Sequence, residues 1–221
     1  MTPAVSIVIP TQRRPGGLAV AMASALAQSG VDPTTVELVV ADNDQVPSAR
    51  AAVEAAATAA PFPVLYVHEP APGVANVRNR ALSVARGALI AFLDDDQDAP
   101  AGWLAGLLAV QAAARADVVF GPVHARAPEG VVTHRAYFER FFSRLDDSAE
   151  GLIDHFYGCG NSLIRRAALP SEQPFAVERN TIGGEDDLLF GTLQATGARF
   201  AWAPRAWVWE DPIPARLTLA Y

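Results

Sequence analysis

Short apolar runs alternate with helical stretches through the first half of the chain, and this alternation is the strongest constraint on its fold. The runs expected as strands cover residues 6–10, 36–42, 63–67, 88–93 and 117–121. The Ala- and Leu-rich stretches expected as helices cover residues 15–28, 48–60, 73–87 and 100–115. Continuous apolar strands separated by helices are typical of βαβ units. We therefore expect an α/β fold with a mostly parallel central sheet flanked by helices.

The second half is less regular. Residues 122–157 form a long connection, and after them come a Gly-rich turn with a short strand, a loop that enters a helix at residues 183–197, and two short strands at 199–203 and 206–211. No internal repeat or low-complexity linker divides the chain. We expect one domain over residues 1–221, in which the irregular half carries a second substrate.

Composition excludes several functional classes. The 221 residues are 51% hydrophobic, so the core needs no disulfide or structural metal, and the net charge of −7 argues against duplex nucleic-acid binding. One cysteine forms no internal disulfide, which suits a reducing compartment. We find no transmembrane stretch and no signal peptide pattern, so we expect a cytoplasmic location.

Polar residues follow three of the expected strands at the point where each strand ends. These residues are Pro10-Thr11, Asp42-Asn43-Asp44 and Asp94-Asp95-Asp96. Ligands of open α/β sheets bind at the carboxyl ends of the strands. The sequence therefore predicts a ligand site at this edge.

The run of three aspartates has two interpretations. Adjacent carboxylates repel one another and normally need a cation, for which oxygen ligands favour Mg²⁺ or Mn²⁺. In an extended segment, Asp94 and Asp96 would converge while Asp95 points aside. The alternative is a solvated acidic turn in which Asp98 caps the helix that starts near Pro100. Both remain open locally, and the buried strand before the run favours the metal.

A second acidic cluster, Glu185-Asp186-Asp187, follows two glycines and precedes an amphipathic helix. A carboxylate there can act as a general base, because the helix start directs it and the glycines allow a substrate to approach. The alternative is a set of acidic residues that complement the helix dipole, and the local pattern alone favours this alternative.

Other chemical signatures are weaker. Cys159 has no evident histidine partner and is interpreted as a small buried residue. The four histidines lack HExxH spacing, and neither GxGxxG nor a Walker A lysine is present. Zinc, dinucleotide and P-loop sites are therefore not indicated.

The order of segments SIVIPT, VELVVADN, PGVANVRNRAL, ARGALIAFLDDDQ with PAGWL, GNSLIRRAAL and GGEDD resembles family 2 glycosyltransferases of the GT-A fold over nearly the whole chain. The resemblance implies an inverting transferase that uses a nucleotide-diphospho-sugar, UDP-sugar by default, and a divalent metal, Mn²⁺ or Mg²⁺. It also implies a Rossmann-like nucleotide half at residues 1–98 and an irregular acceptor and catalytic half at 99–221. Many relatives continue beyond the equivalent of Tyr221, so we expect either a minimal member or part of a longer protein.

The resemblance assigns roles to individual residues. It implies nucleotide contacts by Pro10, Thr11, Arg14, Asp42, Asn43, Arg78, Asp94 and Asp95. It makes Asp96 the direct metal ligand with Asp94 beside it, and it makes Asp186 the catalytic base ahead of Glu185. Asn161 and Gly184 are expected in the donor and acceptor region. A late histidine that reaches the metal in some members is absent, and Glu210 stands nearby in its place.

The implied reaction moves the sugar to a hydroxyl of a saccharide or lipid-linked acceptor. A lipid-linked acceptor would bring the protein to the inner face of the membrane. Two alternatives remain, a nucleotidyltransferase with a similar sheet and a non-catalytic module that binds nucleotide or glycan. The intact Glu185-Asp186 pair favours the enzyme over the module.

Overall fold

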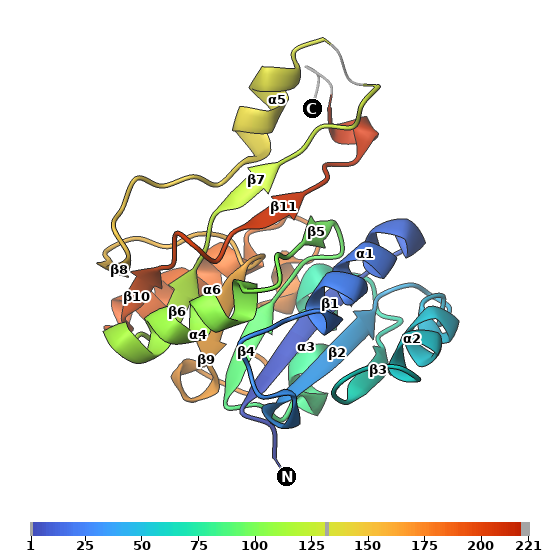
Figure 1. The fold of residues 1–221 in the computed structure, drawn as a ribbon, viewed down its shortest axis with the longest axis horizontal. Coiled ribbons are helices and arrows are strands. Elements are labelled where there is room, and N and C mark those ends of the chain that lie inside the picture. Colours follow the sequence, from blue (N-terminus) through green and yellow to red (C-terminus); the bar gives the residue numbers. More distant parts are fainter. Residues whose placement is uncertain (1, 131–132, 218–221) are drawn as a thin grey trace.

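The computed structural model describes residues 2–130 and 133–217 and contains two sheets, the larger one covered by helices (Figure 1). The helices are α1 (Pro15–Leu26), α2 (Arg50–Ala57), α3 (Val74–Val84), α4 (Trp103–Ala114), α5 (Arg135–Phe142) and α6 (Glu185–Ala195). The strands are β1 (Val5–Thr11), β2 (Val36–Asp42), β3 (Val64–His68), β4 (Leu89–Phe92), β5 (Gln97–Asp98), β6 (Val118–Phe120), β7 (Val123–Ala125), β8 (Gly151–Ile153), β9 (Ser162–Arg165), β10 (Phe200–Trp202) and β11 (Val208–Glu210).

Eight strands of the described residues form the larger sheet, in the order β3-β2-β1-β4-β9-β6-β10-β8. The strands β3, β2, β1 and β4 run parallel, and β10 runs parallel to β6. The strand β9 lies antiparallel between β4 and β6, and β8 is antiparallel at the edge. The α/β fold with a mostly parallel sheet is therefore confirmed, and β9 from the irregular half separates two strands of the regular pattern.

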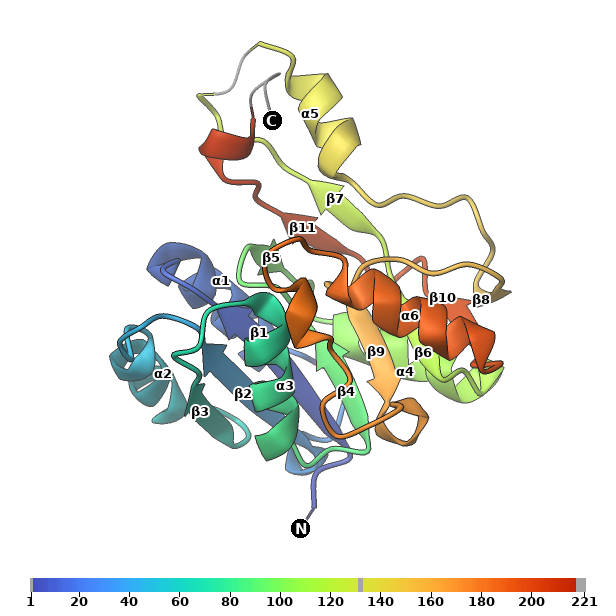
Figure 2. The ribbon, with the colours of Figure 1, turned by 180° about the vertical axis from the view of Figure 1, so that it is seen from behind.

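Each face of the larger sheet has its own apolar core. The helices α1, α2 and α4 cover one face, and α3 and α6 cover the other (Figures 1 and 2). Along β1, Ile7 and Ile9 join the first core, whereas Val8 joins the second. Successive side chains of a strand point to opposite faces, so a strand buried on both faces is apolar except where a polar side chain finds a buried partner. This burial explains the continuous apolar runs of the sequence.

A smaller sheet with the order β5-β11-β7 lies above the carboxyl ends of β1 and β4, and α5 stands beside β7 (Figure 1). The two late strands expected from the sequence are β10 and β11, and they belong to different sheets. Trp207 and Trp209 pack against His124 of β7. The smaller sheet thus builds a wall over the edge where the polar strand ends meet.

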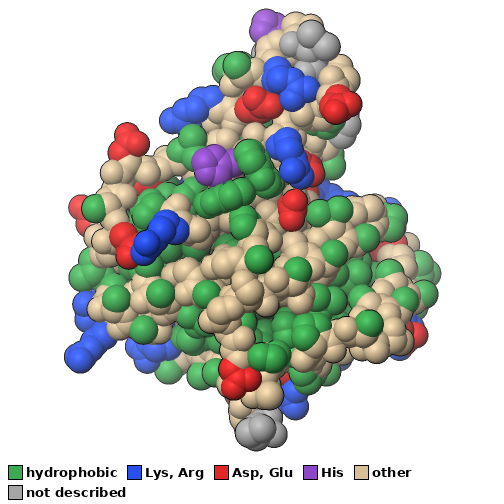
Figure 3. Space-filling model, in the orientation of Figure 1, with side chains coloured by type: hydrophobic (Ala, Val, Ile, Leu, Met, Phe, Trp, Pro, Cys, Tyr) green, Lys and Arg blue, Asp and Glu red, His purple; other side chains and the backbone are tan. Residues whose placement is uncertain are grey.

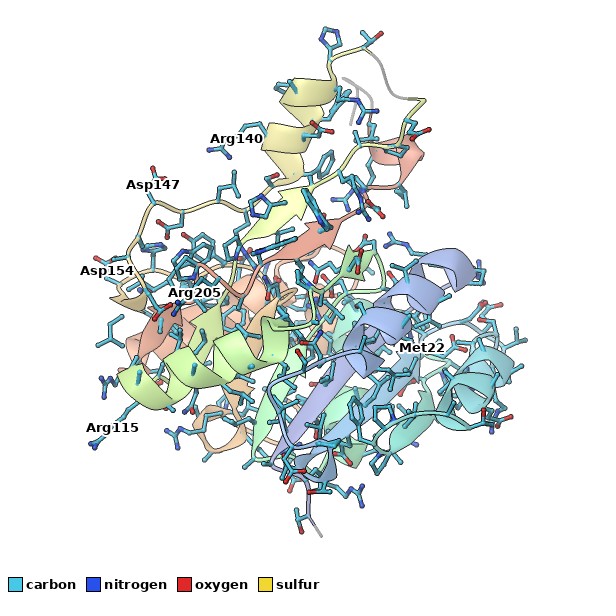
Figure 4. The ribbon with its side chains drawn as sticks, viewed as in Figure 1. Met22, Arg115, Arg140, Asp147, Asp154 and Arg205 are labelled. Carbon is cyan, nitrogen blue, oxygen red and sulfur yellow. The ribbon has the colours of Figure 1, made fainter. Side chains whose placement is uncertain are left out.

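Charged side chains are scattered over the outer surface. On the face that carries α1 and α4, Figure 3 shows most of them near the periphery and on the part that holds α5. Arg140 projects outward from α5, and Asp147 and Asp154 lie on the outer loops (Figure 4). Among the described residues, no helix has the length and apolar character needed to cross a membrane.

A buried carboxylate ties β2 to the start of β1 and to the loop before β4. Glu37 is fully buried, and its Oε1 accepts hydrogen bonds from Ser6 Oγ and from the Arg86 N–H, each at 2.6 Å. Its Oε2 lies 2.7 Å from Arg86 Nη2. Burial alone would raise the pKa of Glu37, but the hydrogen bonds from Ser6 and Arg86 outweigh it and hold the pKa below its ordinary value.

This lowered pKa predicts how stability depends on pH. Ionised Glu37 stabilises the fold above its unfolded pKa of about 4.3, and that contribution is lost as the pH falls through the lower folded pKa. We expect the difference in unfolding free energy between wild type and Glu37→Gln to be largest near neutral pH and to shrink below about pH 4. Urea unfolding of both proteins, from neutral pH down to about pH 3, measures this difference in unfolding free energy. A difference that stays constant down to about pH 3 would contradict the assignment.

Candidate functional site

The polar strand ends meet at one large cavity. It has a volume of about 550 Å³ and lies at the carboxyl ends of β1, β2 and β4, where open α/β sheets bind ligands. The residues that line it are Pro10, Thr11, Gln12, Arg14, Asn43, Pro72, Gly73, Val74, Val77, Arg78, Asp94, Asp95, Asp96, Asn180 and Arg216. The resemblance assigned a set of residues to nucleotide contacts and metal binding. All of them except Asp42 therefore line this cavity.

A small cavity of about 190 Å³ adjoins the large one and shares Arg78 and Asp94 with it. Its walls come from β7, α5, the turn before β9, the start of α6 and β11. The residues that line it are Arg78, Asp94, Gln97, Val123, Phe142, Arg144, Gly158, Cys159, Gly160, Asp186 and Glu210. The two acidic clusters of the sequence thus meet where these cavities join.

The three aspartates after β4 lie on a turn, which corrects the expectation of an extended segment. The turn is closed by the Gln97 N–H, which donates to the Asp94 carbonyl at 3.0 Å. As a result Asp95 and Asp96 converge on Arg14 Nη1, at 2.9 and 2.6 Å, instead of Asp94 converging with Asp96. The capping alternative is wrong, because α4 begins after Gly102 without a side-chain cap.

Asp94 turns to the opposite side of the turn and faces Arg78 and Gly160. Its Oδ1 lies 3.8 Å from Arg78 Nη2. A Cβ on residue 160 would collide with the Asp94 carboxylate, so a larger residue there would force that carboxylate to shift. Burial, together with the negative charges of Asp96 and Asp95, raises the pKa of Asp94 to about 6 despite the neighbouring arginine.

Arg78 joins α3 to α6 through a buried ion pair. Its Nη1 lies 2.5 Å from Glu185 Oε1, and both side chains are 7% exposed. The guanidinium lies 5.4 Å from the centre of the Phe175 ring, and its buried Nε has no hydrogen-bond partner among the described residues. Glu185 is therefore committed to Arg78, which leaves its expected role as a reserve base without support.

Asp186 is the member of the acidic pair that lines the small cavity. Its Oδ2 accepts a hydrogen bond from the Cys159 N–H at 3.0 Å, and its Oδ1 accepts one from the Asp187 N–H at 3.0 Å. Gly184, with a φ of +76°, begins α6 just before the pair. It lines neither cavity, so its expected place in the donor and acceptor region stays a prediction, and in the structure it precedes the helix that carries Asp186.

Glu210 brings a third carboxylate to the small cavity from β11. Burial, strengthened by the negative charges of Asp96 and Asp94, raises the pKa of Glu210 to about 7. Gln97 Nε2 donates to Glu210 Oε2 at 3.2 Å. Glu210, Asp94 and Asp186 thus bring three carboxyl groups to one side of the site.

Asp42 lies beneath the cavity and does not line it. It is fully buried, and its carboxylate accepts hydrogen bonds from the N–H groups of Asp44 and Ala49 and from the Tyr66 hydroxyl. These contacts hold the loop after β2. The expected nucleobase contact by Asp42 therefore lacks support here.

The expectation that Asn161 lies in the donor and acceptor region also lacks support. It is fully buried with a φ of +53°, and it lines neither cavity. Its Oδ1 accepts from Trp103 Nε1 at 2.7 Å, and its Nδ2 donates to the carbonyls of Pro122 and Ala206. Because every polar atom of the amide is used inside the core, Asn161 braces the turn and does not face a ligand.

Two further residues of the large cavity organise their surroundings. Asn43 donates to the carbonyls of Glu69 and Ala71 and accepts from the Gly73 N–H, so it shapes the loop before α3. Thr11 Oγ1 donates to Asp95 Oδ2 at 2.8 Å. Both hold the cavity wall in place.

The prediction that Cys159 is a small buried residue is confirmed. Its side chain is 1% exposed, and burial raises the pKa of its thiol to about 12. The thiol therefore stays protonated at neutral pH, which is unsuited to a nucleophile.

Arg144 is a residue of the site that the sequence did not indicate. Its guanidinium donates to the backbone carbonyls of Gly121, Gly158, Gly160 and Asn161 at 2.6–3.1 Å. It thereby fixes the turn over residues 158–161, which supports both Asp186 and Asp94. It lies in the irregular connection over residues 122–157, where no motif or periodicity marks it.

Whether the carboxylates of the site fit a metal ion depends on their number and position. Within the described ranges, no group of three or more Asp, Glu, His or Cys side chains forms a ready-made metal cage. Mg²⁺ commonly binds one or two carboxylates together with substrate phosphates. Asp96, which borders the large cavity, offers an oxygen ligand of this kind, whereas Asp94 faces Arg78 on the other side of the turn. The residues therefore fit a cation shared with a phosphorylated ligand.

The chain is similar to known proteins in sequence and in fold. The model of glycosyl transferase family 2 matches residues 6–171. The succinoglycan biosynthesis protein ExoM of Rhizobium meliloti (strain 1021) is 37% identical over 219 residues, which cover 98% of this chain and 70% of ExoM.

Two solved structures have a similar fold. The S. aureus TarS 1-349 structure in complex with UDP-GlcNAc matches with a TM-score of 0.68 at 17% identity, over 94% of this chain and 58% of that chain. The mannosyltransferase PcManGT from Pyrobaculum calidifontis, in complex with GDP-Man and Mn2+, matches with a TM-score of 0.72 at 21% identity, over 97% of this chain and 59% of that chain. The chain thus spans about three fifths of either structure.

Replacement of Arg144 tests its bracing role. Arg144→Met removes the side-chain donor to the carbonyls of Gly158, Gly160 and Asn161, so we expect it to lower the unfolding free energy by roughly 2–4 kcal/mol. Urea unfolding measures the loss. Arg205→Met is the control, because Arg205 is 81% exposed, pairs with Glu150 and is labelled in Figure 4. Equal stability of the two variants would refute the role.

Proposed function

The chain belongs to glycosyl transferase family 2, and we propose that it transfers a sugar from a nucleoside-diphosphate sugar to an acceptor hydroxyl with inversion at the anomeric carbon. One observation supports this best: Asp186 lines a small cavity that shares Arg78 and Asp94 with the large cavity at the strand ends. A carboxylate that faces the small cavity therefore stands next to the place where a donor in the large cavity would present its sugar.

The large cavity is the proposed donor site. Its volume of about 550 Å³ suits a nucleotide sugar. Arg14 and Arg78 supply positive charge at the cavity, and guanidinium groups bind phosphates through paired N–H donors. We propose UDP as the nucleotide, as in the TarS complex with UDP-GlcNAc, and GDP is the alternative raised by the PcManGT complex.

Asp96 is the residue proposed to hold a Mg²⁺ or Mn²⁺ ion together with the donor phosphates, with Asp94 close by on the same turn. The Mn2+ in the PcManGT complex agrees with this choice. When bound, such an ion stabilises the negative charge that develops on the leaving diphosphate. Thr11, which donates a hydrogen bond to Asp95 in the same turn, helps to hold that turn at the cavity.

Asp186 is the proposed general base. As the acceptor oxygen forms its bond to the anomeric carbon, Asp186 takes the hydroxyl proton, and the bond from that carbon to the diphosphate oxygen breaks on the opposite face. A single displacement of this kind inverts the configuration. The Cys159 N–H keeps Asp186 in place, and Glu185 holds Arg78 beside the diphosphate.

The acceptor is proposed to enter through the small cavity, so that residues 1–98 bind the donor and residues 99–221 supply the acceptor side and the base. The name of ExoM, a succinoglycan biosynthesis protein, favours a saccharide acceptor over other hydroxyl compounds. A lipid-linked saccharide satisfies the same chemistry.

The binding of UDP to an Asp96 variant tests whether Asp96 is a metal ligand. We expect Asp96→Asn to abolish the Mn²⁺-dependent part of UDP binding, because one anchoring charge is lost. Calorimetric titration of UDP with and without Mn²⁺ measures this. Asp98→Asn is the matched control, since Asp98 is 38% exposed and lines neither cavity. Mn²⁺-dependent binding that survives in Asp96→Asn at the level of the control would refute the assignment.

The turnover rate of an Asp186 variant tests whether Asp186 is the general base. We expect Asp186→Asn to bind UDP as wild type does but to lower kcat by about a hundredfold or more, because the amide cannot accept the proton. Release of UDP from UDP-sugars with a saccharide acceptor measures turnover. Asp187→Asn, the exposed neighbour, should keep wild-type kcat. Normal turnover in Asp186→Asn would eliminate it as the base, and a wild type that binds UDP-sugar without turnover would favour a binding module.

A further inference from the structure

Arg14 lies where the cation of the proposed reaction would be needed. A single nitrogen, Nη1, bridges Asp95 Oδ1 at 2.9 Å and Asp96 Oδ2 at 2.6 Å. The side chain is 32% exposed and lines the large cavity. The positive charge that balances the acidic turn is therefore supplied by the chain itself.

The two aspartates depend on Arg14 to different degrees. Asp95 also accepts hydrogen bonds from Thr11 Oγ1 at 2.8 Å and from the Gln12 N–H at 3.4 Å. For the carboxylate of Asp96, Arg14 is the single hydrogen-bond donor within the described residues. If Arg14 moves away, Asp95 keeps partners, whereas Asp96 needs another cation.

We propose that Arg14 is an exchangeable counter-ion: it neutralises Asp96 in the free protein, and it transfers to the donor diphosphate when a divalent cation takes its place. The inference rests on the proposed function and extends it. Arg14 and the divalent ion compete for one carboxylate, so the ion binds weakly to the free protein. A nucleoside diphosphate gives Arg14 a second anion to pair with, so donor and metal assist each other's binding.

The neighbouring Arg13 provides a matched control. It pairs with Asp44 Oδ1 at 2.8 Å, and neither residue lines the two cavities. Arg13→Gln removes the same charge one residue away, and it leaves the Asp96 contact intact.

The experiment titrates Mn²⁺ into wild type, Arg14→Gln and Arg13→Gln, and it follows the free Mn²⁺ signal by electron paramagnetic resonance, first without nucleotide and then with UDP. Without nucleotide, we expect Arg14→Gln to bind Mn²⁺ about fivefold or more tightly than Arg13→Gln, the lower end of the usual coupling between linked sites. With UDP, we expect wild type and Arg13→Gln to gain much more Mn²⁺ affinity than Arg14→Gln does.

Equal Mn²⁺ affinities of Arg14→Gln and Arg13→Gln without nucleotide would overturn the inference, whether or not UDP promotes Mn²⁺ binding. If Arg14→Gln binds Mn²⁺ more tightly but UDP has no effect on any protein, competition at Asp96 is supported and the proposed donor site fails instead. Arg14→Lys is a second variant that keeps the inference testable if Arg14→Gln does not fold correctly. It keeps the charge, so we expect it to bind Mn²⁺ without nucleotide as weakly as wild type, and tight binding would count against competition.

Discussion

The buried ion pair between Arg78 and Glu185 is the contact on which the geometry of the site depends. It joins α3 from the regular half of the chain to α6 from the irregular half, and both side chains are almost completely buried. Removal of one partner from such a pair typically costs roughly 3–5 kcal/mol, because the other charge is left buried and unpaired. The spacing of the two helices is therefore firmly held. Since Asp186 follows Glu185, the same pair sets the direction in which Asp186 faces.

Charge balance links this contact to the rest of the site. Asp94, Asp186 and Glu210 line the small cavity, and Asp95 and Asp96 border the large one. Arg14 and Arg78 offset part of this negative charge, while the guanidinium of Arg144 is used by backbone carbonyls. A diphosphate alone would add to the repulsion, and a divalent cation alone would compete with Arg14. The arrangement thus favours a ligand that brings both charges together.

The position of the site could be predicted from the sequence because it follows from strand direction. The carboxyl ends of parallel strands meet at one edge, so Thr11, Asn43 and Asp94 had to gather there once the alternation of strands and helices was recognised. The order of the motifs also identified the family, which the match over residues 6–171 confirms. The resemblance ranked Asp186 ahead of Glu185 as the base, but the ion pair between Glu185 and Arg78, which agrees with that order, could not be seen in advance because it forms across two helices.

The sequence by itself determined the α/β fold and the edge of the sheet where polar residues collect, since strands buried on both faces require an apolar pattern that is visible residue by residue. Only the tertiary structure decided what each polar side chain does. Asp42 and Asn161 turn inward and Arg144 braces a turn, because buried N–H and carbonyl groups of the loops must find partners. Which loop groups lack a partner is known only when the chain has folded, and no residue type or spacing records it.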